Sequence, residues 1–267
     1  MESVREPAPE AGVRCNGVMS HRNSVLRFPL VDASAVPWLS VSEMREVDRL
    51  MVDVMGIDLL RMMENAGRST AAVARHLLGG NAGGRRVLVL AGPGGNGGGG
   101  LVAARHLHVA GADVGVWVVG SLERLSPATH AQMSILRAIG VSMRHDRPAV
   151  GAEPPDLIVD ALLGYGQLGA PSEPVRDCIR FAEGRLVLSL DVPSGLELTT
   201  GCVHEPTIKA EATVTVAAPK VGLRGDAAPF VGHLYLADIS VPPAVWAAVG
   251  HGSPSVFGQS AIVQIGH

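Results

Sequence analysis

The most constraining feature of this 267-residue sequence is a run of glycines between two apolar segments. Residues 87–91 and 114–119 are apolar and rich in β-branched side chains, which is typical of strands buried on both faces of a parallel sheet. Between them, residues 92–100 read GPGGNGGGG, and residues 101–110 predict a helix that Gly111 ends. The region therefore predicts a strand-helix-strand unit with its glycine segment at a helix N-terminus.

A glycine segment in this place favours anion binding. Seven of the nine positions are glycine, so another molecule can approach the backbone amides without meeting a Cβ atom. The first amides of a helix lack partners within it, and the helix dipole is positive there, so phosphate or carboxylate is a natural ligand. The alternative is a tight turn without a ligand, which would not need so many glycines.

The rest of the sequence predicts alternating strands and helices. Ser40 and Glu43 form a capping box that begins a helix ending at Gly56, and Asp58 opens a second helix to Leu78. Further strands are expected at residues 141–143, 156–163, 186–190, 212–217 and 233–239, with helices at 126–138 and 174–183. This alternation indicates an α/β fold with a mainly parallel sheet.

Several polar residues directly follow predicted strands. Besides the glycine segment, these are Asp160, Asp191 with Ser194, and Lys220. Ligands of open α/β sheets bind beyond the carboxyl ends of the strands, so we expect these residues on one rim. Asn96, Asp160 and Ser194 offer only oxygen ligands, which suit a hard cation rather than zinc or copper.

Each candidate also has a plainer interpretation. Asp191 precedes Pro193, Ser194 and Gly195, where a carboxylate can simply stabilise a turn. Lys220 is one of two lysines in a chain rich in arginine, which suggests a need for a compact charge, but a surface lysine is an equal alternative. The polar pair Glu64-Asn65 lies within the second predicted helix, where a functional role and a solvated helix face are equal alternatives.

Composition limits the class of protein. The net charge is −3 and basic residues are scattered, which argues against nucleic acid or a membrane surface as partner, and no apolar run reaches the roughly 18 residues of a membrane span. Cys15, Cys178 and Cys202 share no metal or disulfide spacing, so the cytoplasm is expected. Residues 1–37 are expected to be a disordered lead, residues 38–250 the domain and residues 251–267 a tail.

A redox enzyme fits poorly. Residues 92–97 match the GxGxxG dinucleotide fingerprint, but the acidic residue that should end the second strand is missing, and Glu123 lies beyond it. The histidines show no catalytic or metal-binding spacing.

Seven motifs together resemble the YjeF N-terminal domain, the NAD(P)H-hydrate epimerase family. In order they are LSVSEMREVDR, MENAGR, AGPGGNGGGGLVAARHL, VDALLGYG, SLDVPSGL, AAPKVGL and LYLADISVP, spanning about residues 38–245. The resemblance implies a Rossmann-like three-layer α/β/α sandwich that forms a homodimer. It also implies an isomerase that interconverts the R and S epimers at C6 of hydrated NADH and NADPH (NADHX and NADPHX), with a separate dehydratase completing the repair.

The resemblance also implies roles for particular residues. One potassium ion per subunit is held by Asn96, Asp160 and Ser194, and Asp160 is the residue expected to move a proton at C6. The nucleotide is held by Asp191, Lys220 and two glycine-containing segments. These are Gly95, Asn96, Gly97, Gly98 and Gly99, and Gly164, Tyr165, Gly166, Gln167, Leu168, Gly169 and Ala170.

The glycine segment departs from the family pattern, GPGNNGGDG. Gly95 replaces an asparagine and Gly99 an aspartate, which removes two polar side chains but leaves the backbone amides. Each lost hydrogen bond weakens binding by about 0.5–1.5 kcal/mol. The alternative function is therefore a catalytically weakened or inactive protein that binds nucleotide or acts as a scaffold.

Overall fold

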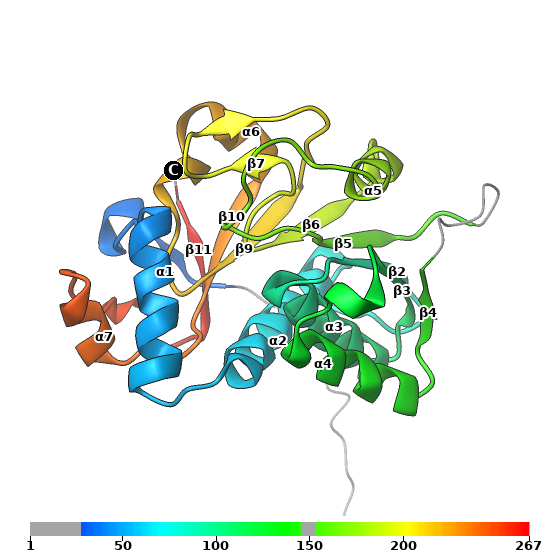
Figure 1. Ribbon diagram of the computed structural model, residues 1–267, viewed down its shortest axis with the longest axis horizontal. Helices are drawn as coiled ribbons and strands as arrows, with labels where there is room; N and C mark the ends of the chain where they lie inside the picture. The colour runs from blue at the N-terminus through cyan, green and yellow to red at the C-terminus, as the bar shows by residue number, and fades with distance from the viewer. Residues whose placement is uncertain (1–27, 146–152, 267) are drawn as a thin grey trace, which may run out of the picture.

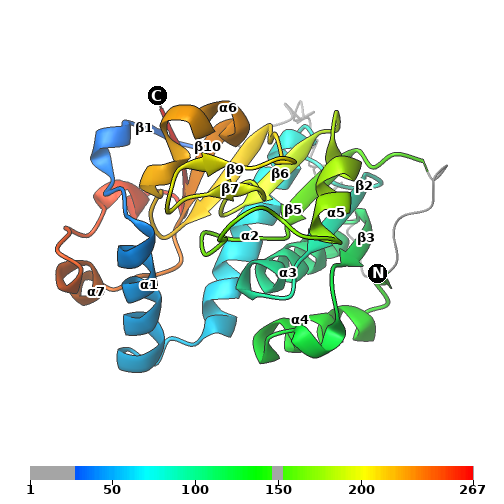
Figure 2. The same cartoon turned by 45° about the horizontal axis from the view of Figure 1, so that its top comes forward.

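The computed structural model describes residues 28–145 and 153–266. Its main sheet contains nine strands in the order β1-β11-β10-β9-β6-β5-β2-β3-β4 (Figures 1 and 2). Every neighbouring pair is parallel except β10 with β11. The strands are β1 (Leu30–Val31), β2 (Arg86–Ala91), β3 (Asp113–Val118), β4 (Ser142–Arg144), β5 (Leu157–Ala161), β6 (Val187–Leu190), β9 (Ala212–Val216), β10 (His233–Ala237) and β11 (Ile262–Ile265). A separate hairpin pairs β7 (Leu196–Glu197) with β8 (Cys202–Val203).

Helices cover both faces of this sheet, which confirms the expected three-layer α/β fold (Figures 1 and 2). Val87 and Val89 of β2 pack in one apolar cluster with α2, α3 and α4, whereas Leu90 packs in another with α5. Successive side chains of a strand point to opposite faces, so one apolar strand serves two layers. The helices are α1 (Val41–Arg49), α2 (Leu59–Leu77), α3 (Gly95–Val109), α4 (Pro127–Ala138), α5 (Val175–Ala182), α6 (Ala228–Val231) and α7 (Pro243–Ala248).

The first two helices begin where the sequence predicts. The Ser40 hydroxyl accepts a hydrogen bond from the Glu43 amide at 3.2 Å, and Glu43 accepts one from the Ser40 amide at 2.7 Å, which completes the capping box. The Asp58 side chain caps α2 by accepting a hydrogen bond from the Arg61 amide at 3.0 Å. Residues 50–54 wind as a π-helix before Gly56, so Val54 is exposed although helical spacing places it with buried Met51.

The glycine segment differs most from its prediction. The helix α3 begins at Gly95 rather than at residue 101, so Gly97 to Gly100 form its first turns and are buried. A Cβ atom on Gly98 would lie 2.5 Å from Met63 Cε of α2, and one on Gly100 would overlap Ala161 of β5. Glycine is therefore needed here because α3 approaches α2 and the sheet closely, in addition to any contact with a ligand.

The domain extends beyond the expected limits of 38 and 250. Leu30 and Val31 pair with β11, and β11 pairs with β10, so segments before residue 38 and after residue 250 belong to the main sheet. The strands β1 and β11 have only 2 and 4 residues, too few to show a clear periodicity, which explains why the sequence did not reveal them. Residues 1–27 of the expected lead lie outside the described residues. Within the described ranges, no helix is both long and apolar enough for a membrane span.

Candidate functional site

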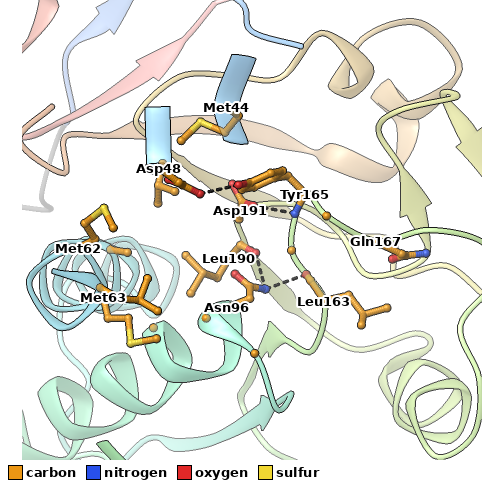
Figure 3. A pocket seen from close by; sticks show the side chains of 18 of the residues that line it. Met44, Asp48, Met62, Met63, Asn96, Leu163, Tyr165, Gln167, Leu190 and Asp191 are labelled. Carbon is orange, nitrogen blue, oxygen red and sulfur yellow. Dashed lines mark hydrogen bonds between the residues drawn. The ribbon is translucent and has the colours of Figure 1, made fainter. Parts of the chain in front are cut away.

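A cavity of about 570 Å³ lies at the carboxyl ends of the central strands (Figure 3). Strand β2 pairs with β3 on one side and with β5 on the other, so the strand order reverses here, as at the ligand sites of open α/β sheets. The lining comes from α1, α2, the β2–α3 turn and the strand ends. It comprises Met44, Asp48, Leu59, Met62, Met63, Ala66, Pro93, Gly94, Gly95, Asn96, Gly99, Leu162, Leu163, Gly164, Tyr165, Gly166, Gln167, Leu190, Asp191, Val216 and Ile239.

Asn96 connects the start of α3 to the ends of two strands at the cavity floor. Its Nδ2 group donates hydrogen bonds to the carbonyl oxygens of Leu163, at 2.7 Å, and Leu190, at 3.1 Å (Figure 3). These carbonyls belong to the segments that follow β5 and end β6. Asn96 lies in the first turn of α3, so it also fixes the free amides of Gly94 and Gly95 against the cavity.

Asp160 is fully buried and does not line the cavity. Its Oδ1 accepts hydrogen bonds from the Ser194 hydroxyl at 2.7 Å and the Leu162 amide at 3.2 Å. Its Oδ2 accepts from the Ser194 amide and the Ser189 hydroxyl, both at 2.9 Å. Burial raises the pKa of Asp160, and these bonds oppose the shift. The carboxylate therefore ties the Ser194 turn to β5 from beneath the cavity.

Asp191 and Lys220 form a buried ion pair beside the cavity. Lys220 Nζ donates to Asp191 Oδ1 at 2.5 Å, and also to the Thr215 hydroxyl and the Val216 carbonyl. Asp191 Oδ2 accepts from the Tyr165 amide at 2.9 Å. Asp191 lines the cavity with a left-handed backbone, φ 69°, a conformation that non-glycine residues adopt mainly at functional sites and turns. Lys220 is fully buried behind it, so it is no surface lysine.

The predicted nucleotide segment 164–170 divides in two. Gly164, Tyr165, Gly166 and Gln167 line the cavity, whereas Leu168, Gly169 and Ala170 are exposed outside it. Two hydrogen bonds hold this segment against residues in and next to the β7–β8 hairpin. Gln167 Oε1 accepts from the Gly195 amide at 2.9 Å, and the Gly169 amide donates to Glu197 at 2.7 Å.

The structure thus brings most of the predicted residues to one rim. Of the glycine segment, Gly95, Asn96 and Gly99 face the cavity, whereas Gly97 and Gly98 are buried inside the packing of α3. The predicted ion ligands Asp160 and Ser194 are bonded to each other, and Asn96 and Ser194 are linked through Leu163, whose amide donates to the Ser194 hydroxyl at 3.1 Å. The catalytic role of Asp160 stays a prediction.

Asp48 is a cavity residue that the sequence analysis did not single out. Its Oδ2 accepts a hydrogen bond from the Tyr165 hydroxyl at 2.5 Å, across 117 positions of sequence (Figure 3). Burial raises the pKa of Asp48 and also raises that of Tyr165, well above its usual range. The available signal was its spacing, because Asp48 follows Met44 by one helical turn on the face that the apolar residues of α1 share.

The wall opposite these carboxylates is apolar. It is formed mainly by Leu59, Met62, Met63 and Ala66 of α2. Glu64 of the same helix points elsewhere, where it forms an ion pair with Arg105 and a hydrogen bond with His106, both of α3. The cavity therefore offers the free backbone amides at the start of α3, an apolar wall, and two carboxylates that are each hydrogen-bonded to a neighbouring side chain.

Comparisons with known proteins agree with this architecture. Residues 59–222 match the family model YjeF-related protein N-terminus. The NAD(P)H-hydrate epimerase of Dehalogenimonas lykanthroporepellens is 41% identical over 228 residues, covering 84% of this chain and 91% of the relative. The bifunctional NAD(P)H-hydrate repair enzyme Nnr of Hyperthermus butylicus is 42% identical over 77% of this chain, which spans 40% of that protein.

A solved structure extends the similarity to the fold. The crystal structure of yeast ynu0, YNL200c, superposes with a TM-score of 0.73 and 25% identity, covering 86% of this chain and all of the yeast chain. The family match covers more than half of the sequence and includes every strand end that builds the cavity except that of β10. The cavity at the strand-order reversal and the sequence similarity lead to one conclusion: this chain belongs to the YjeF-related protein N-terminus family.

Proposed function

We propose that this protein is an NAD(P)H-hydrate epimerase, an isomerase that interconverts the R and S epimers of NADHX and NADPHX. The observation that carries the proposal is the cavity itself, where free amides of α3 and cavity-facing carboxylates meet at the strand-order reversal. The relatives named as epimerases support the same activity.

The charges in the cavity favour one orientation of the substrate. The pyrophosphate is attracted to the amides of Gly94 and Gly95 at the N-terminus of α3. Carboxyl groups line the end of the cavity at Asp48 and Asp191, and the ammonium group of Lys220 is already paired with Asp191, so the uncharged hydrated ring is the part of the substrate suited to this end. The apolar wall of α2 then offers Met62 and Met63 as contacts for the flat faces of the substrate.

We also propose that Asn96, Asp160 and Ser194 hold a potassium ion. Asp160 is a fully buried carboxylate whose hydrogen-bond donors are all uncharged, a charge that a cation would balance. Asn96 Oδ1 accepts no hydrogen bond within the described part of the chain, so it is available as a ligand. In the same part, no group of three His, Cys, Asp or Glu side chains could hold a metal ion, which fits a cation bound by mixed oxygen ligands. The ion would supply positive charge beside Asp160.

The test is an epimerisation assay with one purified epimer of NADHX. We expect the wild-type protein to form the other epimer, faster in potassium than in tetramethylammonium at equal ionic strength. Asp160→Asn should abolish the response to potassium, because it removes the charge that the ion balances. No epimerisation at high enzyme concentration would reject the function, and an unchanged potassium response in Asp160→Asn would reject the ion site alone.

The finer assignments follow the same proposal. A dehydratase that removes water from one epimer would complete the repair, since the bifunctional relatives are named as repair enzymes. We further propose a homodimer that acts in the cytoplasm. Light scattering coupled to gel filtration tests the dimer directly.

A further inference from the structure

Three carboxylates lie at or beneath the cavity, and their oxygens are committed to different degrees. Both oxygens of Asp160 accept hydrogen bonds, and the residue has no exposed surface. Both oxygens of Asp191 are engaged as well, one by Lys220 and the other by the Tyr165 amide. Asp48 is different, because only its Oδ2 is bonded within the described residues, and it lines the cavity. Of the carboxylates that line the cavity, Asp48 therefore has the oxygen, Oδ1, that is left for a substrate.

From this arrangement we propose that Asp48 is the catalytic acid and base of the epimerisation, positioned by Tyr165. The inference rests on the proposed function. It assigns to α1 a role that the sequence analysis predicts for Asp160.

Tyr165 is suited to hold Asp48 rather than to take its proton. Its hydroxyl donates to Asp48, and its backbone amide donates to Asp191, so the residue is fixed at both ends. Its ring lies 5.6 Å from Lys220 Nζ, which adds a cation–π contact. Burial, followed by the charge of Asp48, raises the pKa of the phenol, so Tyr165 remains a hydrogen-bond donor.

The surroundings of Asp48 favour its protonated form. Burial raises its pKa and the charge of Asp191 adds to this, whereas the Tyr165 hydrogen bond and the charge of Lys220 oppose it. The charge of Arg45, on the same helix, lowers the pKa of Tyr165. Helix α2 and Ile239 contribute apolar side chains to this part of the cavity. Because Tyr165 is bonded to Oδ2, Oδ1 is the oxygen left to carry the proton that the substrate receives.

The reaction can then be written with all atoms balanced. Asp48 donates its proton to the C6 hydroxyl, the C6–O bond breaks, and water leaves while the N1 lone pair forms an N1=C6 iminium bond. Water then adds to the opposite face of C6, the electron pair returns to N1, and Asp48 takes the released proton. The carboxyl group ends in its starting state, and neither an oxidant nor a second substrate is needed.

Asp48→Asn tests the proposal, because asparagine keeps the shape and can still accept the Tyr165 hydrogen bond. The rates are measured with one purified epimer after subtraction of the uncatalysed rate. We expect kcat to fall roughly 100-fold or more, as for loss of a general acid-base group, with KM within about threefold. Asp53→Asn is the matched control, an exposed aspartate in the π-helix that follows α1, and should leave both constants unchanged.

The variant Tyr165→Phe tests whether Tyr165 positions Asp48 or only stabilises the fold. Activity should fall as the pH rises through the pKa of Asp48, because the first step needs its proton. The Tyr165 hydrogen bond lowers that pKa, so its loss should move the descending limb of the kcat profile to higher pH. A structural defect alone would lower the rate without moving the limb.

The outcomes separate the two proposals. If the wild-type protein epimerises and Asp48→Asn keeps kcat within threefold, or changes only KM, the role of Asp48 is rejected and the function stands. If the wild-type protein does not epimerise, both are rejected. Should Asp48→Asn fail to fold by circular dichroism, an unmoved pH limb in Tyr165→Phe rejects the assignment.

Discussion

At the scale of single residues, the carboxylates at and beneath the cavity are stabilised in different ways. Asp191 depends on an ammonium group, because Lys220 Nζ lies 2.5 Å from its Oδ1 and is fully buried. Asp160 depends on uncharged hydroxyl and amide donors. Removing one partner of a buried ion pair leaves an uncompensated charge, whereas removing both does not.

Lys220→Met should therefore destabilise the fold strongly. We expect a loss of about 3–5 kcal/mol in the free energy of unfolding, since the Asp191 carboxylate stays buried without its cation. The double variant Asp191→Asn with Lys220→Met should recover part of that loss, because it also removes the charge. Urea unfolding of the two single variants, the double variant and the wild type gives the coupling energy. Additive losses would show that the pair is not coupled.

At the scale of elements, the glycines of α3 serve two purposes along one helix. Gly95 faces the cavity, and a Cβ atom there would meet only Met63 and Leu59 at 3.9 and 4.0 Å. Gly100 faces the sheet, where a Cβ atom would overlap Ala161 and lie 3.3 Å from Val89 Cγ1. Gly95 therefore has room for a side chain, whereas Gly97, Gly98 and Gly100 have none.

Two substitutions in α3 should have opposite effects on stability. Gly100→Val should cost about 1–3 kcal/mol, because overpacking forces the helix away from β5. Gly95→Ala should be neutral or stabilising by up to about 1 kcal/mol, since alanine restricts the unfolded chain and its Cβ lies at ordinary van der Waals distance from its neighbours. Chemical denaturation of both variants checks this. Equal stability of the two would contradict the packing role assigned to Gly100.

At the scale of the whole molecule, the sheet is completed by both ends of the described chain. The strand β11 lies between β1 and β10 and buries Ile262, Val263 and Ile265. Burying an aliphatic side chain contributes roughly 1.5–3 kcal/mol, and a domain's total stability is about 5–15 kcal/mol. Its removal would also expose the edge of β10 for pairing with other molecules.

Deletion of residues 251–267 should accordingly unfold the protein or lower its Tm sharply. A matched control replaces Gln264, a partly buried side chain of β11, with threonine, which preserves the strand. Circular dichroism during heating measures both variants. A cooperative transition at the wild-type Tm in the truncated protein would show that β11 is dispensable.

The sequence predicted the parts of this molecule whose signals are local. Buried parallel strands such as residues 87–91 are continuous apolar runs, and the Ser40 capping box is a fixed pattern, so both were placed correctly. Because the rule for strand ends is topological, it also placed Asp160, Asp191 and Lys220 near one rim. The remaining features depend on tertiary contacts. The glycine-rich start of α3 packs against α2 and β5. The pairing of β1 with β11 and the hydrogen bond between Asp48 and Tyr165 likewise join segments distant in sequence.

The strand-order reversal that creates the cavity also divides the sheet into two arms. From β2 the chain of pairings runs outward through β3 to β4, and from β5 it runs the opposite way through β6 to β9. A molecule bound to Gly95 and Asp191 contacts both arms of the sheet at once. Its binding free energy therefore adds to the free energy needed to separate the two arms. Occupancy of the cavity thus stabilises the junction between β2 and β5, in addition to the backbone hydrogen bonds that pair these strands.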